Sequence, residues 1–147
     1  MRYTIVPMKA AHLDQVEAIE RTCFSDAWSR RLLEDMLTLP GAIALAAVDG
    51  EGAVLGYVSA QTVLDEGYVN NVAVRPQSRR QGVASALLEE LRRLAAEREL
   101  AFLTLEVRAS NRSAQALYAG QGYREAGCRP GYYQHPREDA ILMTLEF

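Results

Sequence analysis

A glycine preceded by two arginines is the first feature of this sequence with an evident chemistry. Residues 79–84 read Arg-Arg-Gln-Gly-Val-Ala and lie between an apolar, strand-like segment and a helix-like one. Free N–H groups at a helix start bind anions, and a glycine such as Gly82 lets a phosphate approach closely. The stretch lacks the glycine spacing of nucleoside-triphosphate and dinucleotide motifs. It therefore predicts a different phosphate-binding turn, with an ordinary solvated loop as the alternative.

A carboxylate and a phenol follow this turn along the chain. Glu106 stands near the end of the apolar segment 102–107, and Tyr118 lies in the next helix-like segment. A positioned carboxylate can accept a proton, and a phenol can donate one. Ligands bind outside the carboxyl ends of parallel strands, so the turn and Glu106 are expected to face one opening. A solvated strand end and a core aromatic residue are the alternative interpretations.

Hydrophobic periodicity predicts the elements that position these groups. Strands are expected at residues 3–6, 42–48, 54–64, 68–74, 102–107, 123–133 and 140–147. Helices are expected at residues 10–23, from an N-cap at Ser29 to 39, from Gly82 to about 98, and from a cap at Ser110 or Asn111 to about 121. The strand, helix, strand order makes 68–74 and 102–107 parallel, after an antiparallel meander. The fold class is therefore α+β with a mixed sheet and about four helices.

The strand at residues 68–74 is expected to contain a β-bulge. Side chains of a regular strand alternate between its two faces. Val69 would therefore lie on one face, and Val72 and Val74, which follow Asn70 and Asn71, would lie on the other. One inserted residue would return all three valines to the same face.

Composition narrows the classes of function. The 147 residues, of which 49% are hydrophobic and 24% charged, predict one globular domain over residues 1–147. A net charge of −3 argues against direct nucleic-acid binding. The sequence shows no membrane-spanning run, no signal-peptide pattern and no metal-ligand spacing around its two cysteines and two histidines. We expect a cytoplasmic protein, a monomer or weak dimer, without a metal.

Several of these segments resemble the GCN5-related N-acetyltransferases (GNAT). The resemblance rests on Arg79-x-x-Gly82-x-Ala84 after the strand 68–74, on residues 106–111, on Ala-Leu-Tyr at 116–118 and on Gly-Tyr at 122–123. Residues 63–66, 132–133 and 137–143 are similar to the bacterial ribosomal-protein-alanine N-acetyltransferases within that family. The resemblance covers most of the chain. It departs at Ala27-Trp28-Ser29, where the family has Pro-Trp-Ser, and at Ala84, where glycine is also frequent.

The resemblance implies a sheet splayed around acetyl-CoA, with Glu106 as general base and Tyr118 as general acid. The positions that match contacts to acetyl-CoA are Val72, Ala73, Val74, Arg79, Arg80, Gln81, Gly82, Val83, Ala84, Ser85, Asn111 and Tyr118. The expected acceptor-side residues are Trp28, Asp65, Glu66, Tyr132, Tyr133, Glu138 and Asp139. Surface acids and packed tyrosines are the alternative interpretation for this last group.

The implied reaction moves acetyl from acetyl-CoA to a protein N-terminal α-amine, such as the alanine of a small-subunit ribosomal protein. An α-amine has a pKa near ~8 against ~10.4 for lysine, so it needs only a modest base. Transfer to a small-molecule amine or a lysine side chain is the alternative within enzymes. A non-catalytic acyl-CoA-binding sensor is the alternative from another class, and the presence of both Glu106 and Tyr118 argues against it.

Overall fold

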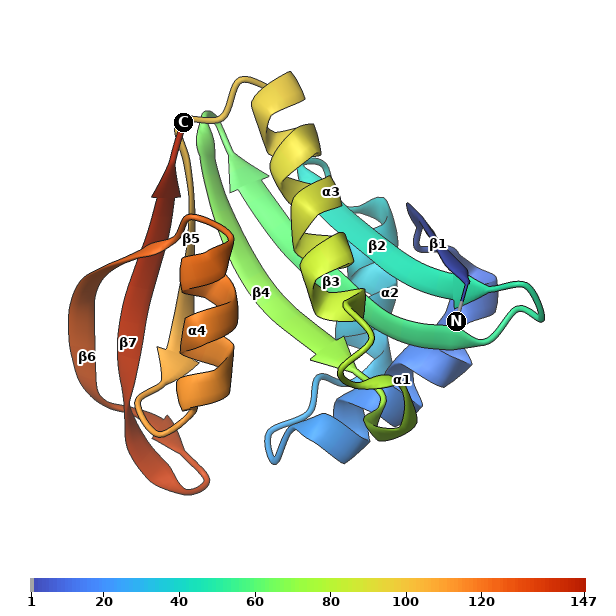
Figure 1. Cartoon of the computed structure of the whole chain (residues 1–147), viewed down its shortest axis with the longest axis horizontal. Helices are drawn as coiled ribbons and strands as arrows, with labels where there is room; N and C mark the ends of the chain where they lie inside the picture. Colours follow the sequence, from blue (N-terminus) through green and yellow to red (C-terminus); the bar gives the residue numbers. More distant parts are fainter. Residues whose placement is uncertain (1) are drawn as a thin grey trace.

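The computed structural model describes residues 2–147 and builds them around a seven-stranded sheet (Figure 1). The strands are β1 (Tyr3–Pro7), β2 (Ala42–Asp49), β3 (Val54–Val63), β4 (Glu66–Val74), β5 (Phe102–Arg108), β6 (Arg124–Gln134) and β7 (Arg137–Glu146). The helices are α1 (Leu13–Cys23), α2 (Arg30–Thr38), α3 (Val83–Glu97) and α4 (Arg112–Gly120), with short 3-10 turns η1 (Ala10–His12) and η2 (Pro76–Ser78). The predicted α+β class is confirmed.

The strand order is β1-β2-β3-β4-β5-β7-β6, and its centre is the parallel pair β4 and β5. This pair extends only from Glu66 opposite Phe102 to Tyr68 opposite Thr104. Beyond these residues the two strands diverge, as Figure 1 shows between the green β4 and the orange β5. The other neighbouring strands of residues 2–147 are antiparallel. The expected mixed sheet with a splayed parallel pair is therefore present.

Two hydrophobic layers hold the helices against the sheet, with α3 and α4 on one face and α1 and α2 on the other (Figure 1). Leu87, Leu88 and Leu91 of α3 are almost fully buried in the first layer. Val16 of α1 and Leu33 of α2 are equally buried in the second. Burying one such side chain stabilises the fold by about 1.5–3 kcal/mol, so both layers fix the frame that surrounds the site.

The predicted bulge lies in β4. Ser59 of β3 pairs with Asn71, whereas the next residue, Ala60, pairs with Val69. Asn70 is therefore the inserted residue. As expected, Val69 and Val72 both pack into the α3 layer despite their opposite phases in the sequence.

The predicted caps are also present. The Ser29 hydroxyl accepts a hydrogen bond from the Leu32 N–H at 3.2 Å, and the Asn111 side chain accepts one from the Ala114 N–H at 3.2 Å. Gly82 precedes α3 with φ 76° and Gly122 follows α4 with φ 100°, the left-handed region that favours glycine.

Some boundaries differ from the prediction: β4 begins at Glu66 rather than at 68, residues 10–12 form a 3-10 turn before α1, and the largest difference lies in the last hairpin. Strand β7 begins at Arg137 rather than at 140, and β6 continues to Gln134, so His135 and Pro136 alone join them. The charged run at 137–139 reads as a loop in the sequence. It forms strand here because the tip of this hairpin extends beyond the core, where polar residues cost little on either face of the strand.

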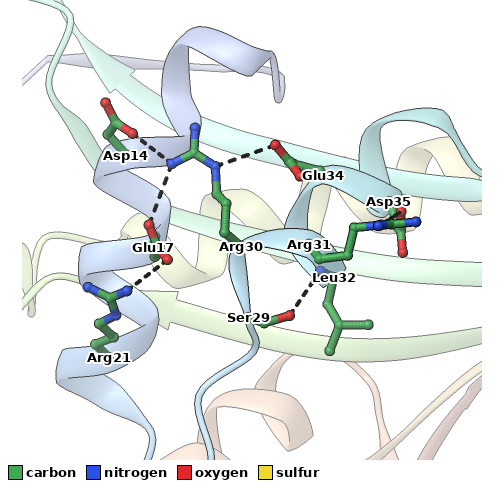
Figure 2. A network of polar contacts seen from close by, with 9 residues as sticks. All are labelled: Asp14, Glu17, Arg21, Ser29, Arg30, Arg31, Leu32, Glu34 and Asp35. Carbon is green, nitrogen blue, oxygen red and sulfur yellow. Dashed lines mark hydrogen bonds and ion pairs between the residues drawn. The ribbon is translucent and has the colours of Figure 1, made fainter.

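An ionic network joins α2 to α1 (Figure 2). The Arg30 guanidinium lies 2.7 Å from the Asp14 carboxylate, 3.5 Å from that of Glu17 and 3.9 Å from that of Glu34. Glu17 also pairs with Arg21 at 2.9 Å. The loop between the two helices, residues 24–29, is thereby held at the end where α2 begins.

Candidate active site

The divergence of β4 and β5 opens a cleft of about 810 Å³. Its volume is typical of a small-molecule site. The lining comes from the α1–α2 loop, the middle of β4, the second half of β5, α4 and β6. Its residues are Cys23, Phe24, Ser25, Asp26, Trp28, Tyr68, Val69, Asn70, Asn71, Val72, Thr104, Glu106, Val107, Arg108, Asn111, Ala114, Tyr118, Tyr132 and Tyr133.

Glu106 lies in this cleft beside two tyrosines of β6. The Tyr132 hydroxyl donates a hydrogen bond to the Glu106 carboxylate, which raises the pKa of Tyr132. Burial, together with the negative charge of Glu106, raises the pKa of Tyr133 to about 12. The Arg108 guanidinium lies 4.3 Å from the centre of the Tyr133 ring and holds it by a cation–π contact. Glu106 is thus a carboxylate with neutral hydroxyls around it.

Tyr118 faces the cleft from α4 while its ring packs in the core. It lies 5.9 Å from the ring of Tyr123, centre to centre, and is 9% exposed. Burial raises the pKa of Tyr118 to about 12. The phenol therefore keeps its proton at neutral pH and can donate a hydrogen bond into the cleft. The same side chain is thus part of the core and part of the cleft wall, and its role as a proton donor stays a prediction.

A second, shallower hollow of about 450 Å³ lies at the start of α3. Asn111 and Ala114 line both this hollow and the cleft, so the two adjoin. A Cβ atom on Gly82 would meet only the Tyr3 hydroxyl, at 3.8 Å, so the space above the turn is open. Arg79 donates a hydrogen bond to the Val74 carbonyl at 3.3 Å, which ties the turn to the end of β4.

The hollow has the electrostatics of an anion site. Within residues 2–147 neither Arg79 nor Arg80 forms an ion pair with a carboxylate. Their charges add to the positive end of the α3 dipole. The residues present therefore fit a phosphate group.

The predicted acetyl-CoA residues fall into three groups. Val72 and Tyr118 line the cleft, and Asn111 lines both cavities. The hollow is lined by Val74, Arg79, Arg80, Gly82, Val83, Ala84 and Ser85. Two residues line neither cavity: Ala73 is buried on the α1 side of the sheet, and the Gln81 carbonyl accepts a hydrogen bond from the Tyr3 hydroxyl at 3.4 Å.

Three of the predicted acceptor-side residues, Trp28, Tyr132 and Tyr133, line the cleft. We call these three the acceptor wall. Asp65 and Glu66 do not reach it, because they lie where β4 begins. There the Asp65 carbonyl accepts the Ala101 N–H at 2.7 Å, and the Glu66 carboxylate accepts the Tyr68 hydroxyl.

Glu138 and Asp139 also lie outside the cleft lining, since β7 already includes them. The Glu138 carboxylate accepts the Ser110 N–H at 2.6 Å and pairs with Arg108 at 3.3 Å. These contacts, the Ser110 hydrogen bond first, lower the pKa of Glu138. Asp139 accepts the Gly131 N–H at 2.8 Å. The carboxylate of Asp139 therefore makes its contact within the β6–β7 hairpin, and that of Glu138 contacts Arg108 and Ser110 beside the hairpin.

The comparisons with known proteins decide the family. Residues 13–123 match the acetyltransferase (GNAT) family. The chain belongs to this family. It is 38% identical to the [ribosomal protein bS18]-alanine N-acetyltransferase of Escherichia coli strain K12, over 97% of this chain and 96% of that protein.

Solved GNAT structures agree with this fold. The crystal structure of the ribosomal-protein-S18-alanine N-acetyltransferase from Escherichia coli has a TM-score of 0.90 and 35% identity, and covers 99% of this chain and 94% of that one. Arabidopsis thaliana NAA60 in complex with acetyl-CoA has a TM-score of 0.91 over 99% of both chains, at 21% identity. The latter likeness concerns the fold alone. This GNAT chain is therefore an N-acetyltransferase.

Sequence reasoning missed the residues that close the acceptor side. The Asp26 carboxylate lies 2.8 Å from Nδ1 of the His135 ring, and the Ser25 hydroxyl donates to the His135 carbonyl. These contacts link the α1–α2 loop to the β6–β7 turn across 109 residues of sequence. No local pattern signals such a contact.

Two further observations concern residues 2–147. No helix in that range combines the length and the apolar character that crossing a bilayer requires. The same range contains no group of three or more His, Cys, Asp or Glu side chains arranged to hold a metal ion.

Proposed function

We propose that this GNAT protein transfers acetyl from acetyl-CoA to the N-terminal α-amine of a ribosomal protein, and that the acceptor residue is alanine. The observation that carries the proposal is a cleft lined by Glu106, Tyr118 and the acceptor wall that adjoins the hollow at the start of α3, whose residues fit a phosphate group. The relative from Escherichia coli, which is named for this reaction, supports the choice of acceptor. Ribosomal proteins are made in the cytoplasm, so we place the reaction there.

The cofactor side of the cleft suits acetyl-CoA. The first N–H groups of α3, with Arg79 and Arg80, would bind the pyrophosphate. Beyond Tyr68, β4 has no ladder partner on the β5 side, so its N–H and C=O groups are available to the amides of the pantetheine arm. The bulge at Asn70 and Asn71 would then lie beside the acetyl group.

Glu106 would accept a proton from the incoming ammonium, directly or through a water. An α-amine needs little help at neutral pH, because its pKa lies near ~8. The free amine then attacks the thioester carbonyl directly. A backbone N–H of β4 near Val72 would donate to the oxygen that becomes negative in this step.

Tyr118 would donate a hydrogen bond to the sulfur that leaves when the thioester breaks. Its O–H is available because burial keeps the phenol protonated, with a pKa of about 12. An ordinary thiol has a pKa near ~8.5. The phenol therefore first stabilises the departing thiolate by a hydrogen bond. The proton that the attacking nitrogen loses as the amide forms would then pass to the sulfur by way of the Tyr118 hydroxyl, which gives the free thiol and leaves the phenol protonated.

The experiment is mass spectrometry of peptides incubated with the protein and acetyl-CoA. One series varies only the first residue. A matched peptide has a blocked N-terminus and an internal lysine, and a free diamine represents small amines. We expect acetylation of the α-amine, fastest on alanine, and none on the blocked peptide. Modification confined to lysine or to the diamine would exclude the proposed acceptor, and no transfer to any amine would favour a binding protein.

A further inference from the structure

Glu20 of α1 is a charged residue with no exposed surface, and the mechanism above does not use it. It continues the buried stripe of Leu13 and Val16 at helical spacing. A carboxylate at such a position needs partners, because burying an unpaired charge is very costly. A glutamate is usually exposed to solvent. The helical spacing of Glu20 from Leu13 and Val16, however, places it on the buried face of α1.

The Glu20 carboxylate receives three hydrogen bonds from three different parts of the fold. The Trp28 backbone N–H donates to Oε2 at 2.7 Å. The Asn71 side-chain amide donates to Oε1 at 2.7 Å. The Tyr57 hydroxyl of β3 also donates to Oε1. Burial raises the pKa of Glu20, and the bonds from Trp28 and Asn71 oppose that rise.

Two of these three partners line the cleft. Trp28 belongs to the acceptor wall, and Asn71 belongs to the bulge of β4. The third, Tyr57, is fully buried in the core and anchors the carboxylate. Ser59, which pairs with Asn71 across the ladder, has a buried hydroxyl without a hydrogen-bond partner in residues 2–147. Glu20, not Ser59, therefore holds the Asn71 side chain.

We propose that Glu20 is a positioning residue for acetyl transfer, which fixes the acceptor wall and the β4 bulge relative to each other through one carboxylate. The proposal rests on the acetyl transfer assigned to this cleft. A rigid link between the two walls sets where the acceptor amine meets the acetyl group. Errors of about 1 Å in such an alignment cost about 10²-fold in rate.

The substitution Glu20→Gln tests the link with almost no change of volume. A glutamine has one oxygen and one NH₂ group. If the NH₂ group faces the Trp28 N–H, two donors meet and the acceptor wall is released. If it faces Asn71, that amide must turn over to present its oxygen. In either case one wall of the cleft loses its present contact.

Glu17→Gln is the matched control, because Glu17 lies on the same helix but contacts only Arg21 and Arg30. We expect Glu20→Gln to lower kcat/KM for an alanine-terminated peptide by about 10- to 100-fold. Acetyl-CoA affinity by calorimetry should stay within about twofold, because none of the three residues that Glu20 contacts lines the hollow at the start of α3. Glu17→Gln should change neither quantity, because Arg30 keeps its pairs with Asp14 and Glu34 and so still joins the two helices.

Trp28 is the single tryptophan of the chain, so its fluorescence reports the acceptor wall directly. We expect Glu20→Gln to shift the emission of Trp28 and Glu17→Gln to leave it unchanged. Circular dichroism checks that each variant is folded. A folded Glu20→Gln protein with unchanged emission and wild-type kcat/KM would overturn the proposal. So would an equal loss of acetyl-CoA affinity, which indicates general structural damage.

If Glu20→Gln does not fold, Tyr57→Phe tests the role of Glu20 instead. It removes one anchor of the carboxylate and keeps the ring in the core. The same shift in emission and a smaller fall in peptide kcat/KM are expected, and no change in either refutes the link. If the wild-type protein acetylates a different amine, the variants are assayed with that amine. Failure of the proposed acceptor is thus distinguished from failure of the role of Glu20.

Discussion

Glu106 lines the cleft beside Tyr132 and Tyr133, and we propose it as the general base. The substitution Glu106→Gln keeps the shape of the side chain and an oxygen that can accept from Tyr132, but it removes the proposed base. We expect kcat to fall about 10²-fold or more, with the largest loss at low pH, where more of the acceptor amine is protonated. Acetyl-CoA affinity, measured by calorimetry, should be unchanged. A variant with the wild-type rate from pH 6 to 9 would remove Glu106 from the role of base.

Tyr118 and Tyr123 offer a matched pair of phenols. Tyr118→Phe should lower kcat by about 10²-fold, because the departing sulfur loses its donor. Tyr123→Phe should leave kcat unchanged, since the Tyr123 hydroxyl is buried and without a partner in residues 2–147. Removing such a group is neutral or stabilising.

The raised pKa of Tyr118 predicts how the rate of acetyl transfer changes with pH. In its proposed role Tyr118 must be a protonated phenol, and its pKa is about 12. Activity that depends on Tyr118 is therefore complete at neutral pH and is lost only as pH rises toward that value. Steady-state rates measured from pH 6 to 10 check this, and an alkaline loss below pH 10 that Tyr118→Phe abolishes would contradict it.

Gly82 tests the phosphate-binding turn, with Gly52 as its control. Both have positive φ, 76° and 82°, so a β-branched side chain strains each turn alike. Gly82→Val and Gly52→Val should each lose about 1–2 kcal/mol of stability. Only Gly82→Val should weaken acetyl-CoA binding, by more than about tenfold, because its side chain covers the start of α3. Calorimetry of both variants measures this, and equal affinities would remove the turn from cofactor binding.

The structural role of a single residue could be predicted where neighbouring residues in the sequence reveal it. The change of phase at Asn70 and Asn71 is local, and it predicts the bulge. The place of Asp65 and Glu66 relative to the cleft depends on where their strand begins, and neither residue lines the cleft. A strand rises about 3.3 Å per residue, so five residues of β4 separate Glu66 from the bulge by about 17 Å.

The network around Arg30 is a property of two helices rather than of one residue. Arg30→Met removes the contacts to Asp14, Glu17 and Glu34, which span α1 and α2 (Figure 2). We expect a melting temperature lower by a few degrees and a higher KM for the peptide, because the α1–α2 loop is less firmly held. Arg31→Met removes only an exposed pair with Asp35 within α2 and should change neither quantity. Equal effects of the two variants would show that the network does not order the loop.

Elements were easier to predict than the contacts between them. The N-cap at Ser29 and the stripe of α3 follow from spacing, and both are present. The hairpin of β6 and β7 was predicted too short, because polar residues at its tip hide the alternation. The link between Asp26 and His135 joins two loops 109 residues apart in sequence, which the sheet as a whole brings together, so no periodicity encodes it.

Acetyl-CoA binding is expected to stabilise the whole molecule, because it involves several elements at once. The cofactor is proposed to contact β4 and α3 on one side of the cleft and α4 on the other. Any ligand of the folded state stabilises it, by about 2.7 kcal/mol at 100-fold excess over Kd. For a chain of this size the melting temperature should rise by about 5–10 °C. Calorimetric scans of wild type and Gly82→Val compare the two, and an equal rise in both would contradict cofactor binding at this turn.

The short pairing of β4 with β5 gives the sheet four edges instead of two. β1 and β6 form the outer edges, and the inner ones run along β4 beyond Tyr68 and along β5 beyond Thr104. Unpaired strand edges are templates on which other chains can add and aggregate. The inner edges of this molecule face each other across the cleft, whose volume of about 810 Å³ suits a small ligand rather than the sheet of a neighbouring molecule. The same backbone groups can thus stay open to a ligand for the life of the protein without becoming sites of self-association.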